Sequence, residues 1–474
     1  MPEIHELSAL EISAAYAAGD TDPVEVVDHF LSRVEAHSDT YGAFVTVTTE
    51  QARERARAAA KRLADNDQVT PLTGVPTAIK DLNLTAGVRT TFGSAAMEAF
   101  VPEISDRVVQ NLEGAGLVSL GKTNTPEFGS PCYTEPDVAP PARTPYDQSR
   151  SAGGSSGGAG AAVASGLLPV AQGSDGGGSI RIPASVCGLV GIKPTRGRIS
   201  GAPMYGDITG LSTAGTLART TRDAAALLDV LAGPAPSDPL WAERVAESYL
   251  DHCDRDPGTL RIGRFATPVV ADADVDPQVL FAYDRLSERL EELGHVVDDI
   301  DPPVTSAIVP VFETVWSVSA AMFAVPEDRQ SLLRPLSRWL RERGARTSGP
   351  EFANALARMN QIGAKVIADL APYDAILTPT LAQLPAKIGG IRNDDDPAAD
   401  FEAQKQFTPY TSLWNVTGMP AVSLPTGWST EGLPIGTMLA GRPGSEHVLC
   451  SLAAQIEAAH SDTGRPWNRP AVMP

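Results

Sequence analysis

The stretch from Gly153 to Pro183 constrains the fold more than any other part of this chain. Glycine occupies positions 153, 154, 157, 158, 160, 166, 173, 176, 177 and 178. Glycine loses more conformational freedom on folding than any other residue, so such a cluster indicates backbone that takes unusual angles or approaches a ligand closely. The small-residue run 159–168 predicts a tightly packed helix between two glycine-rich turns, which hold Ser155 and Ser179.

The second of these turns has the composition of an anion-binding loop. Three glycines, 176 to 178, directly precede Ser179. Successive backbone N–H groups in such a turn can point at one spot and stabilise an oxyanion. The pattern therefore predicts an oxyanion site beside a serine hydroxyl.

The same stretch resembles the signature of the amidase signature hydrolases. Gly-Gly-Ser-Ser-Gly-Gly-Ala-Gly at 153–160 and Gly-Ser-Asp-Gly-Gly-Gly-Ser-Ile-Arg-Ile-Pro at 173–183 match nearly every position of that signature. Further blocks continue the match at 74–81, 121–129, 187–195, 197–200, 415–421 and 432–436. The resemblance covers most of the chain, with a weaker middle between about 235 and 375.

The resemblance implies a Ser-Ser-Lys catalytic triad. Ser179 would be the acyl-forming nucleophile, Ser155 would relay its proton, and Lys80 would be the base. The family holds the peptide bond at Ser155 in the cis form. A free lysine titrates near about 10.4, so Lys80 would have to be buried to be neutral, and the apolar run 77–79 before it fits that requirement.

The resemblance also implies how the reacting carbonyl is held. The backbone N–H groups of Gly176, Gly177, Gly178 and Ser179 would form the oxyanion hole. The backbone carbonyl of Gly129 would meet the substrate amide. Relatives often carry Thr, Ile or Ala where this chain has Gly176, so that position is expected to leave more room.

Three neighbouring residues are expected to support this turn. Asp175 and Arg181 would brace it, and Ser156 would form a hydrogen bond nearby. For Asp175 and Arg181, a purely structural ion pair remains an equal alternative.

Other hydrolase and nucleotide-binding patterns fit less well. Gly153-Gly154-Ser155-Ser156-Gly157 also matches the G-x-S-x-G nucleophile elbow of α/β-hydrolases, with His447 as the candidate base. That elbow should follow a strand, yet a polar run, 147–150, precedes it. The dinucleotide pattern G-x-G-x-x-G is incomplete and no P-loop occurs. The seven histidines are scattered, which predicts no metal site, and no cofactor is expected.

The order of short apolar runs and helical patterns predicts an α/β protein. The resemblance implies the amidase signature fold, in which helices cover both sides of a mixed central β-sheet. We interpret 1–474 as a single amidase domain, with the core signature at 70–235. The region of about 300–410 would be variable and would form the substrate entrance.

Two parts of this variable region carry separate expectations. The segment 306–345, rich in aromatic residues, would wall the substrate entrance, with ordinary core packing as the alternative. The segment 388–401, which contains Asp394, Asp395 and Asp396, is expected to be a mobile acidic loop.

The net charge and the cysteine content limit which binding partners and which cellular compartment are expected. A net charge of −20 argues against nucleic acid or an anionic membrane as a partner. No run reaches the apolar length of a membrane span, and the acidic N-terminus lacks a secretory core. The four cysteines show neither a zinc spacing nor a disulfide framework. We expect a cytoplasmic monomer or homodimer.

The blocks at 122–127 and 134–136 most resemble relatives that cleave aryl amides, nylon-type amides and carbamates. The chain is therefore expected to be an amidase for a small-molecule amide or carbamate, with ester cleavage as a side activity. The alternative is the glutamine-hydrolysing subunit of a tRNA-dependent amidotransferase, which belongs to the same family and delivers ammonia to a partner.

Overall fold

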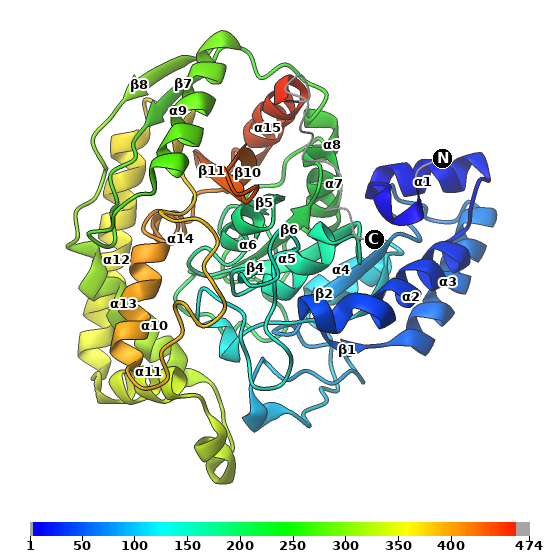
Figure 1. Ribbon diagram of the computed structural model, residues 1–474, viewed down its shortest axis with the longest axis horizontal. Coiled ribbons are helices and arrows are strands. Elements are labelled where there is room, and N and C mark those ends of the chain that lie inside the picture. The colour runs from blue at the N-terminus through cyan, green and yellow to red at the C-terminus, as the bar shows by residue number, and fades with distance from the viewer. Residues whose placement is uncertain (1–2, 461–474) are drawn as a thin grey trace.

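The computed structural model describes residues 3–460 and contains a large mixed β-sheet (Figure 1). Its eight strands run in the order β4-β6-β5-β10-β11-β9-β7-β8. Strand β7 pairs in parallel with β8 and β9, and the other pairings are antiparallel. The strands are β4 (Val170–Asp175), β5 (Val190–Lys193), β6 (Thr213–Ala218), β7 (Arg261–Arg264), β8 (Val296–Asp299), β9 (Ala375–Pro379), β10 (Ala421–Trp428) and β11 (Pro434–Gly441).

A separate three-stranded sheet, ordered β1-β3-β2, lies beside it. It consists of β1 (Phe44–Val47), β2 (Pro76–Lys80) and β3 (Val118–Thr123). All residues of β2 are buried. The Lys80 backbone N–H donates to Gln172 Oε1 of β4 at 3.0 Å, and Thr77 Oγ1 donates to the Val170 carbonyl at 3.2 Å. These bonds bring Lys80 to the end of the signature strand β4.

Helices flank both sheets, as expected for an α/β protein (Figure 1). They are α1 (Ala9–Ala18), α2 (Pro23–Tyr41), α3 (Thr49–Ala64), α4 (Arg107–Gly114), α5 (Gly157–Ala164), α6 (Arg181–Val186), α7 (Thr221–Leu231), α8 (Tyr249–His252), α9 (Pro277–Glu292), α10 (Ile308–Met322), α11 (Pro335–Arg346), α12 (Gly349–Leu370), α13 (Pro397–Phe407), α14 (Leu413–Val416) and α15 (Glu446–His460). Short 3₁₀ turns lie at Ile4–Glu6, Ala95–Met97, Glu127–Gly129 and Glu327–Leu332.

Helix α5 confirms the helix expected between the two glycine turns. Every residue of this helix is buried. A Cβ built on Gly158 would lie 2.3 Å from the Asn124 backbone nitrogen, so only glycine allows the helix to approach the chain there. The small residues of the signature therefore let α5 pack inside the molecule.

The acidic loop expected at 388–401 is shorter than predicted, because helix α13 begins at Pro397. Asp396 accepts hydrogen bonds from the backbone N–H groups of Ala398 and Ala399 and so caps helix α13, which Pro397 opens. Asp394 pairs with Arg334 at 2.6 Å. Asp396 therefore caps a helix, and Asp394, in the loop before it, is paired with an arginine.

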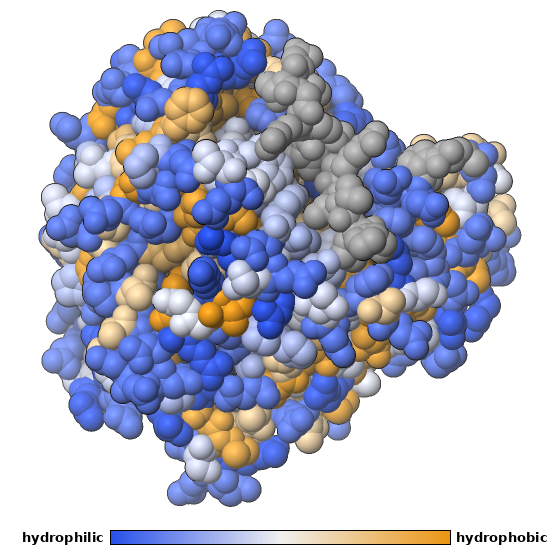
Figure 2. Space-filling model, viewed as in Figure 1, coloured by the Kyte–Doolittle hydropathy of each residue, from blue (hydrophilic) through white to orange (hydrophobic). Residues whose placement is uncertain are grey.

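None of the helices in residues 3–460 is long and apolar enough to cross a membrane. The face shown in Figure 2 is largely hydrophilic, with apolar side chains in small, separate groups. Exposed Met322, Phe323 and Leu332 belong to the projecting connection between α10 and α11.

Candidate active site

Lys80 and Ser155 are in direct contact inside the protein. Lys80 ends strand β2, and its side chain is fully buried. Its Nζ lies 2.8 Å from Ser155 Oγ, and it also donates to the Ser174 carbonyl at 3.2 Å and to Ser174 Oγ at 3.0 Å. The structure thus brings together two of the three residues of the expected triad.

Burial shifts the acidity of this lysine. Desolvation lowers the pKa of Lys80 to about 7, against a smaller opposing effect of the Asp175 carboxylate. A charged ammonium is destabilised when it loses water, because the low-dielectric interior does not replace its hydration. A substantial fraction of Lys80 is therefore neutral near pH 7 and able to accept a proton.

The turn that carries Ser155 has the backbone that the resemblance implies. The peptide bond between Gly154 and Ser155 is cis. A Cβ on Gly154 would lie 2.6 Å from the Tyr133 backbone nitrogen, and one on Gly129 would lie 2.5 Å from Leu82 and 3.3 Å from Ser155 Oγ. Gly129 thus lies beside Ser155.

Ser179 lines a cavity. Ser156 joins the two glycine turns, because its backbone N–H donates to the Ser179 carbonyl at 3.1 Å and its Oγ donates to the Ser174 carbonyl at 3.2 Å. Within residues 3–460 the structure records no hydrogen bond of Ser179 Oγ, including one to Ser155 Oγ. The serine hydroxyl is thus unengaged at the cavity surface.

The glycine turn differs from the expectation at one position. The Gly178 N–H donates to Asp175 Oδ1 at 2.7 Å, so it already has an acceptor and its assignment to the oxyanion hole is corrected. In the described part of the chain, the N–H groups of Gly176, Gly177 and Ser179 have no recorded acceptor. These three remain as donors for an oxyanion.

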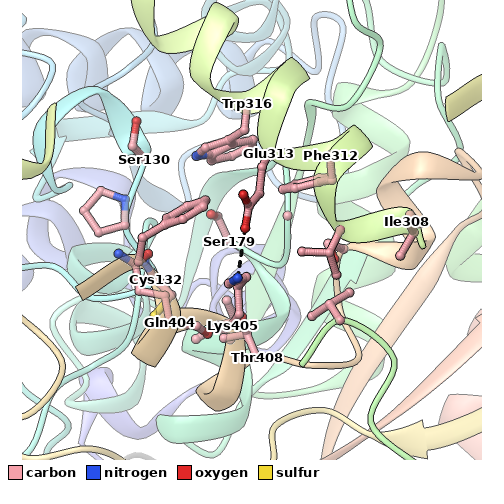
Figure 3. Close-up of a pocket in the computed structure, with 17 residues that line it drawn as sticks. Ser130, Cys132, Ser179, Ile308, Phe312, Glu313, Trp316, Gln404, Lys405 and Thr408 are labelled. Carbon is pink, nitrogen blue, oxygen red and sulfur yellow. Dashed lines mark hydrogen bonds and ion pairs between the residues drawn. The ribbon is translucent and has the colours of Figure 1, made fainter. Parts of the chain in front are cut away.

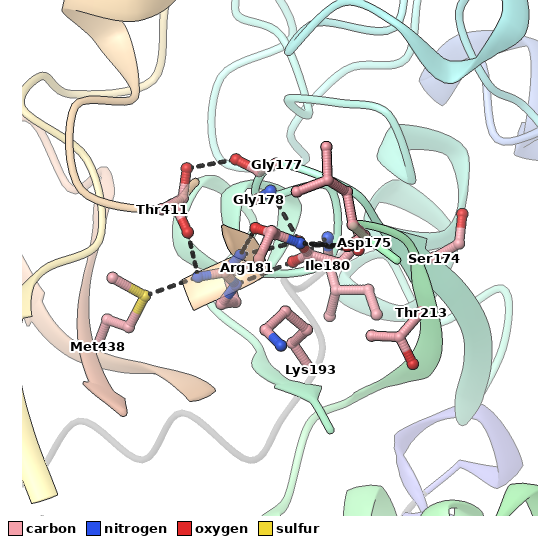
Figure 4. A network of polar contacts seen from close by, with 12 residues as sticks. Ser174, Asp175, Gly177, Gly178, Ile180, Arg181, Lys193, Thr213, Thr411 and Met438 are labelled. Carbon is pink, nitrogen blue, oxygen red and sulfur yellow. Dashed lines mark hydrogen bonds and ion pairs between the residues drawn. The ribbon is translucent and has the colours of Figure 1, made fainter. Parts of the chain in front are cut away.

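Asp175 and Arg181 form the buried centre of a network behind the turn (Figure 4). Arg181 donates to both carboxylate oxygens of Asp175, at 2.9 and 2.8 Å. Asp175 also accepts from the Ile180 N–H at 3.2 Å and from Asn415 Nδ2 at 2.9 Å. Burial alone would raise the pKa of Asp175, but Arg181 holds it well below its usual range. The carboxylate therefore fixes the turn through two backbone N–H groups, those of Gly178 and Ile180.

The cavity beside Ser179 is lined mainly by two helices and one loop (Figure 3). Helix α10 contributes Phe312 and Trp316, whose rings stack with centroids 5.4 Å apart. A Cβ on Gly176 would lie 3.6 Å from Trp316, and one on Gly177 would lie 3.8 Å from Phe312. The room expected at Gly176 is therefore occupied by the Trp316 ring, in ordinary van der Waals reach of the turn.

The segment 306–345 contributes both to the cavity and to ordinary packing, through different residues. Phe312 and Trp316 line the cavity, whereas Trp339 of α11 packs against Phe401 with ring centroids 5.7 Å apart. Sequence reasoning missed the polar lining residues Cys132, Glu313, Gln404 and Lys405. They come from three distant segments, and no local pattern marks them.

The structure does not bring the alternative base to either serine. The ring of His447, on α15, lies 5.1 Å from the ring of His252, and no contact of His447 with Ser155 or Ser179 is recorded between residues 3 and 460. No group of His, Cys, Asp or Glu in that part of the chain could hold a metal ion.

Comparison with known proteins agrees with this geometry. The family model described as "Amidase" matches residues 25–450. The 6-aminohexanoate-cyclic-dimer hydrolase of Paenarthrobacter ureafaciens is 34% identical over 481 residues, covering 96% of this chain and 94% of the relative.

Two solved structures share the whole fold. A structure of 6-aminohexanoate cyclic dimer hydrolase superposes with a TM-score of 0.90 at 32% identity, covering 98% of this chain and 99% of its own. A bacterial aryl acylamidase of the amidase signature family superposes with a TM-score of 0.83 at 26% identity, covering 99% and 100%. The chain therefore belongs to the amidase signature family, whose members hydrolyse C–N amide bonds.

Proposed function

We propose that this amidase works through a Ser179 acyl-enzyme, with Ser155 and Lys80 as the proton relay. The observation that carries the proposal is the buried Lys80 Nζ at 2.8 Å from Ser155 Oγ, with a pKa lowered to about 7. A neutral amine can accept the proton of a hydroxyl that it contacts. That hydroxyl can in turn accept the proton of a second hydroxyl, so the amine acts as general base for both. Ser179 would be that second hydroxyl.

The proposed reaction uses these groups in two steps. Ser179 Oγ attacks the carbonyl carbon while its proton passes to Ser155 and the proton of Ser155 passes to Lys80. The N–H groups of Gly176, Gly177 and Ser179 stabilise the negative charge on the carbonyl oxygen. The relay then returns a proton to the leaving nitrogen as the C–N bond breaks. Water, deprotonated by the same relay, releases the acid and restores Ser179.

The proposed substrate is a small, largely apolar amide. Phe312, Trp316 and Ile308 give the cavity an apolar side that accepts an aryl or aliphatic group next to Ser179. Relatives named for a cyclic amide dimer and for aryl acylamidase activity support this class. Because an acyl-enzyme can also form from carbamates and esters, urethane and ester cleavage are proposed as side activities.

The glutamine-hydrolysing subunit of a tRNA-dependent amidotransferase remains the second candidate. The observation that favours it is the charged pair Glu313–Lys405 in the cavity lining, since free glutamine carries an ammonium and a carboxylate. Against it, both side chains already have partners within the protein, Glu313 also with Arg343 and Lys405 also with Glu402.

The test is release of aniline from acetanilide-type and aryl carbamate substrates, beside ammonia release from glutamine, by wild type and Lys80→Ala. Anilide or carbamate turnover that disappears in the variant supports the stand-alone amidase. Turnover of glutamine alone would instead support the glutamine-hydrolysing amidotransferase subunit. Full activity of Lys80→Ala contradicts the relay.

We further propose that 1–474 acts as a single amidase domain, as a monomer or a homodimer. Light scattering of the purified protein, with limited proteolysis to find separable parts, tests both statements.

A further inference from the structure

One ion pair stands at the edge of the cavity, between the helices that form its walls. Glu313 of α10 accepts a hydrogen bond from Lys405 of α13 at 2.8 Å, and Figure 3 shows this contact close to Ser179. The exposed fractions of the two side chains are 18% and 19%. Both charges are thus largely withdrawn from solvent at the place where a substrate would lie.

Each member of the pair has a second partner outside the cavity lining. Glu313 also accepts from Arg343 at 3.0 Å, and Lys405 also pairs with Glu402 at 2.6 Å. Burial opposes both charges, but their hydrogen bond to each other, together with the contacts to Arg343 and Glu402, lowers the pKa of Glu313 and raises that of Lys405. Two acidic side chains thus pair with two basic ones, so the formal charges of the group balance.

Going beyond the proposed amidase reaction but resting on it, we propose that the Glu313–Lys405 pair is a specificity determinant that restricts the cavity to substrates uncharged near the scissile amide. Charged substrates would be disfavoured because each would come close to a side chain of like charge in the pair.

A substrate carboxylate that reaches Lys405 lies beside Glu313 and repels it. A substrate ammonium that reaches Glu313 lies beside Lys405 and repels that side chain. Because these charges are poorly hydrated, their repulsion is strong, and water cannot screen it as it does on the surface. An uncharged amide, aryl or alkyl group enters without disturbing the pair and packs on Phe312 and Trp316.

The rule predicts opposite effects of two substitutions. Glu313→Gln removes one anion and leaves the group around Lys405 with an excess positive charge, so the cavity becomes selective for carboxylates. Lys405→Met removes the cation and leaves Glu313, so the cavity becomes selective for ammonium groups. Both replacements approximately conserve side-chain length, and neither residue belongs to the buried core.

The experiment measures affinity in the Ser179→Ala protein, where no ligand is consumed. The probes are acetanilide, 4-acetamidobenzoate and N-[4-(aminomethyl)phenyl]acetamide, which at pH 7 are neutral, anionic and cationic. Each affinity is expressed relative to that of acetanilide in the same protein, so a general change in packing cancels. Quenching of Trp316 fluorescence or calorimetry gives the dissociation constants.

With Glu313 and Lys405 intact, both charged probes should bind about tenfold or more weakly than acetanilide. Adding Glu313→Gln should raise the relative affinity of the carboxylate by about tenfold and lower that of the ammonium, and Lys405→Met should do the reverse. Glu402→Gln is the matched control, because Glu402 pairs with the same lysine but is half exposed and outside the lining. Its relative affinities should change by less than about twofold.

The inference is overturned if all three probes bind equally to the Ser179→Ala protein, if acetanilide does not bind, or if both substitutions shift the carboxylate and the ammonium in the same direction. Hydrolysis by wild type is assayed separately. Charge-selective binding without hydrolysis would contradict the proposed reaction and leave the charge rule standing.

Discussion

The glycine turn, residues 174–181, and the cavity wall, formed by α10 and α13, lie side by side but differ in how they are built. The turn presents backbone groups. Within the described part of the chain, the N–H groups of Gly176, Gly177 and Ser179 have no recorded acceptor, and Asp175 holds the turn by accepting hydrogen bonds from two further backbone N–H groups. The wall works through side chains, above all the stacked Phe312 and Trp316 and the pair Glu313–Lys405.

We expect this difference to separate the residues that carry out the reaction from those that select the substrate. The backbone of this turn requires glycine at position 178, since a Cβ there would lie 2.5 Å from Thr411 Oγ1 and its φ is +133°. A wall made of side chains can change residue by residue without altering the turn. Changes in the turn should therefore abolish catalysis or folding, whereas changes in the wall should alter which substrate is used.

The largest effect is expected from the relay itself. Ser179→Ala and Lys80→Met should each lower kcat for an anilide by about 10⁴-fold or more, because one removes the nucleophile and the other the base. Circular dichroism and thermal unfolding serve as the folding control. A folded Lys80→Met protein with more than a tenth of wild-type kcat would show that Lys80 is not the base.

The next effect concerns stability behind the turn. Asp175→Asn leaves the buried guanidinium of Arg181 without its carboxylate, and both side chains are fully buried. Breaking such a pair from one side costs about 3–5 kcal/mol in the free energy of unfolding. Urea denaturation measures it, with Asp394→Asn as the control, because the pair of Asp394 with Arg334 is partly exposed. Equally small losses of unfolding free energy in both variants would contradict the conclusion that Asp175 holds the turn together.

A smaller effect is expected from the wall. Trp316→Ala removes an aromatic surface from the cavity and should raise KM for an anilide by about 10- to 100-fold, with a smaller change in kcat. Trp339→Ala is the matched control, because Trp339 packs against Phe401 and does not line the cavity. A change in kcat that exceeds the change in KM would show that Trp316 affects the reaction step more than substrate binding. The distinction between the glycine turn and the cavity wall would then fail.

The smallest expected effect is a pH dependence. Burial lowers the pKa of Lys80 to about 7, and the proposed relay needs the neutral amine, so raising the pH should increase the active fraction. The kcat/KM for a neutral anilide should rise by about tenfold per unit below pH 7 and level off above it. A profile that is flat between pH 5 and 9, measured under conditions where the protein stays folded, would contradict a titrating lysine base.

The two regions also differ in how far sequence reasoning reaches. The glycine-rich pattern predicts Lys80, Ser155 and Ser179 as the triad, and the structure places Lys80 Nζ against Ser155 Oγ and Ser179 at the cavity. The error at Gly178 arose because a glycine run does not say which N–H groups are already taken by a neighbouring carboxylate.

The wall shows why the rest escaped prediction. Glu313 and Lys405 are 92 residues apart, and only the packing of α10 near α13 makes them partners. Residues 394–396 do lie in a loop, but composition does not reveal that Asp394 pairs with Arg334 or that Asp396 caps α13.

The most direct test of the central claim is to locate the acyl group. Wild-type protein is mixed with an activated aryl carbamate, quenched in acid within the first turnovers and digested for peptide mass mapping. The account predicts one carbamoyl increment on Ser179, absent in Ser179→Ala and formed far more slowly in Lys80→Met. An increment on Ser155, or acylation at an unchanged rate without Lys80, would contradict it.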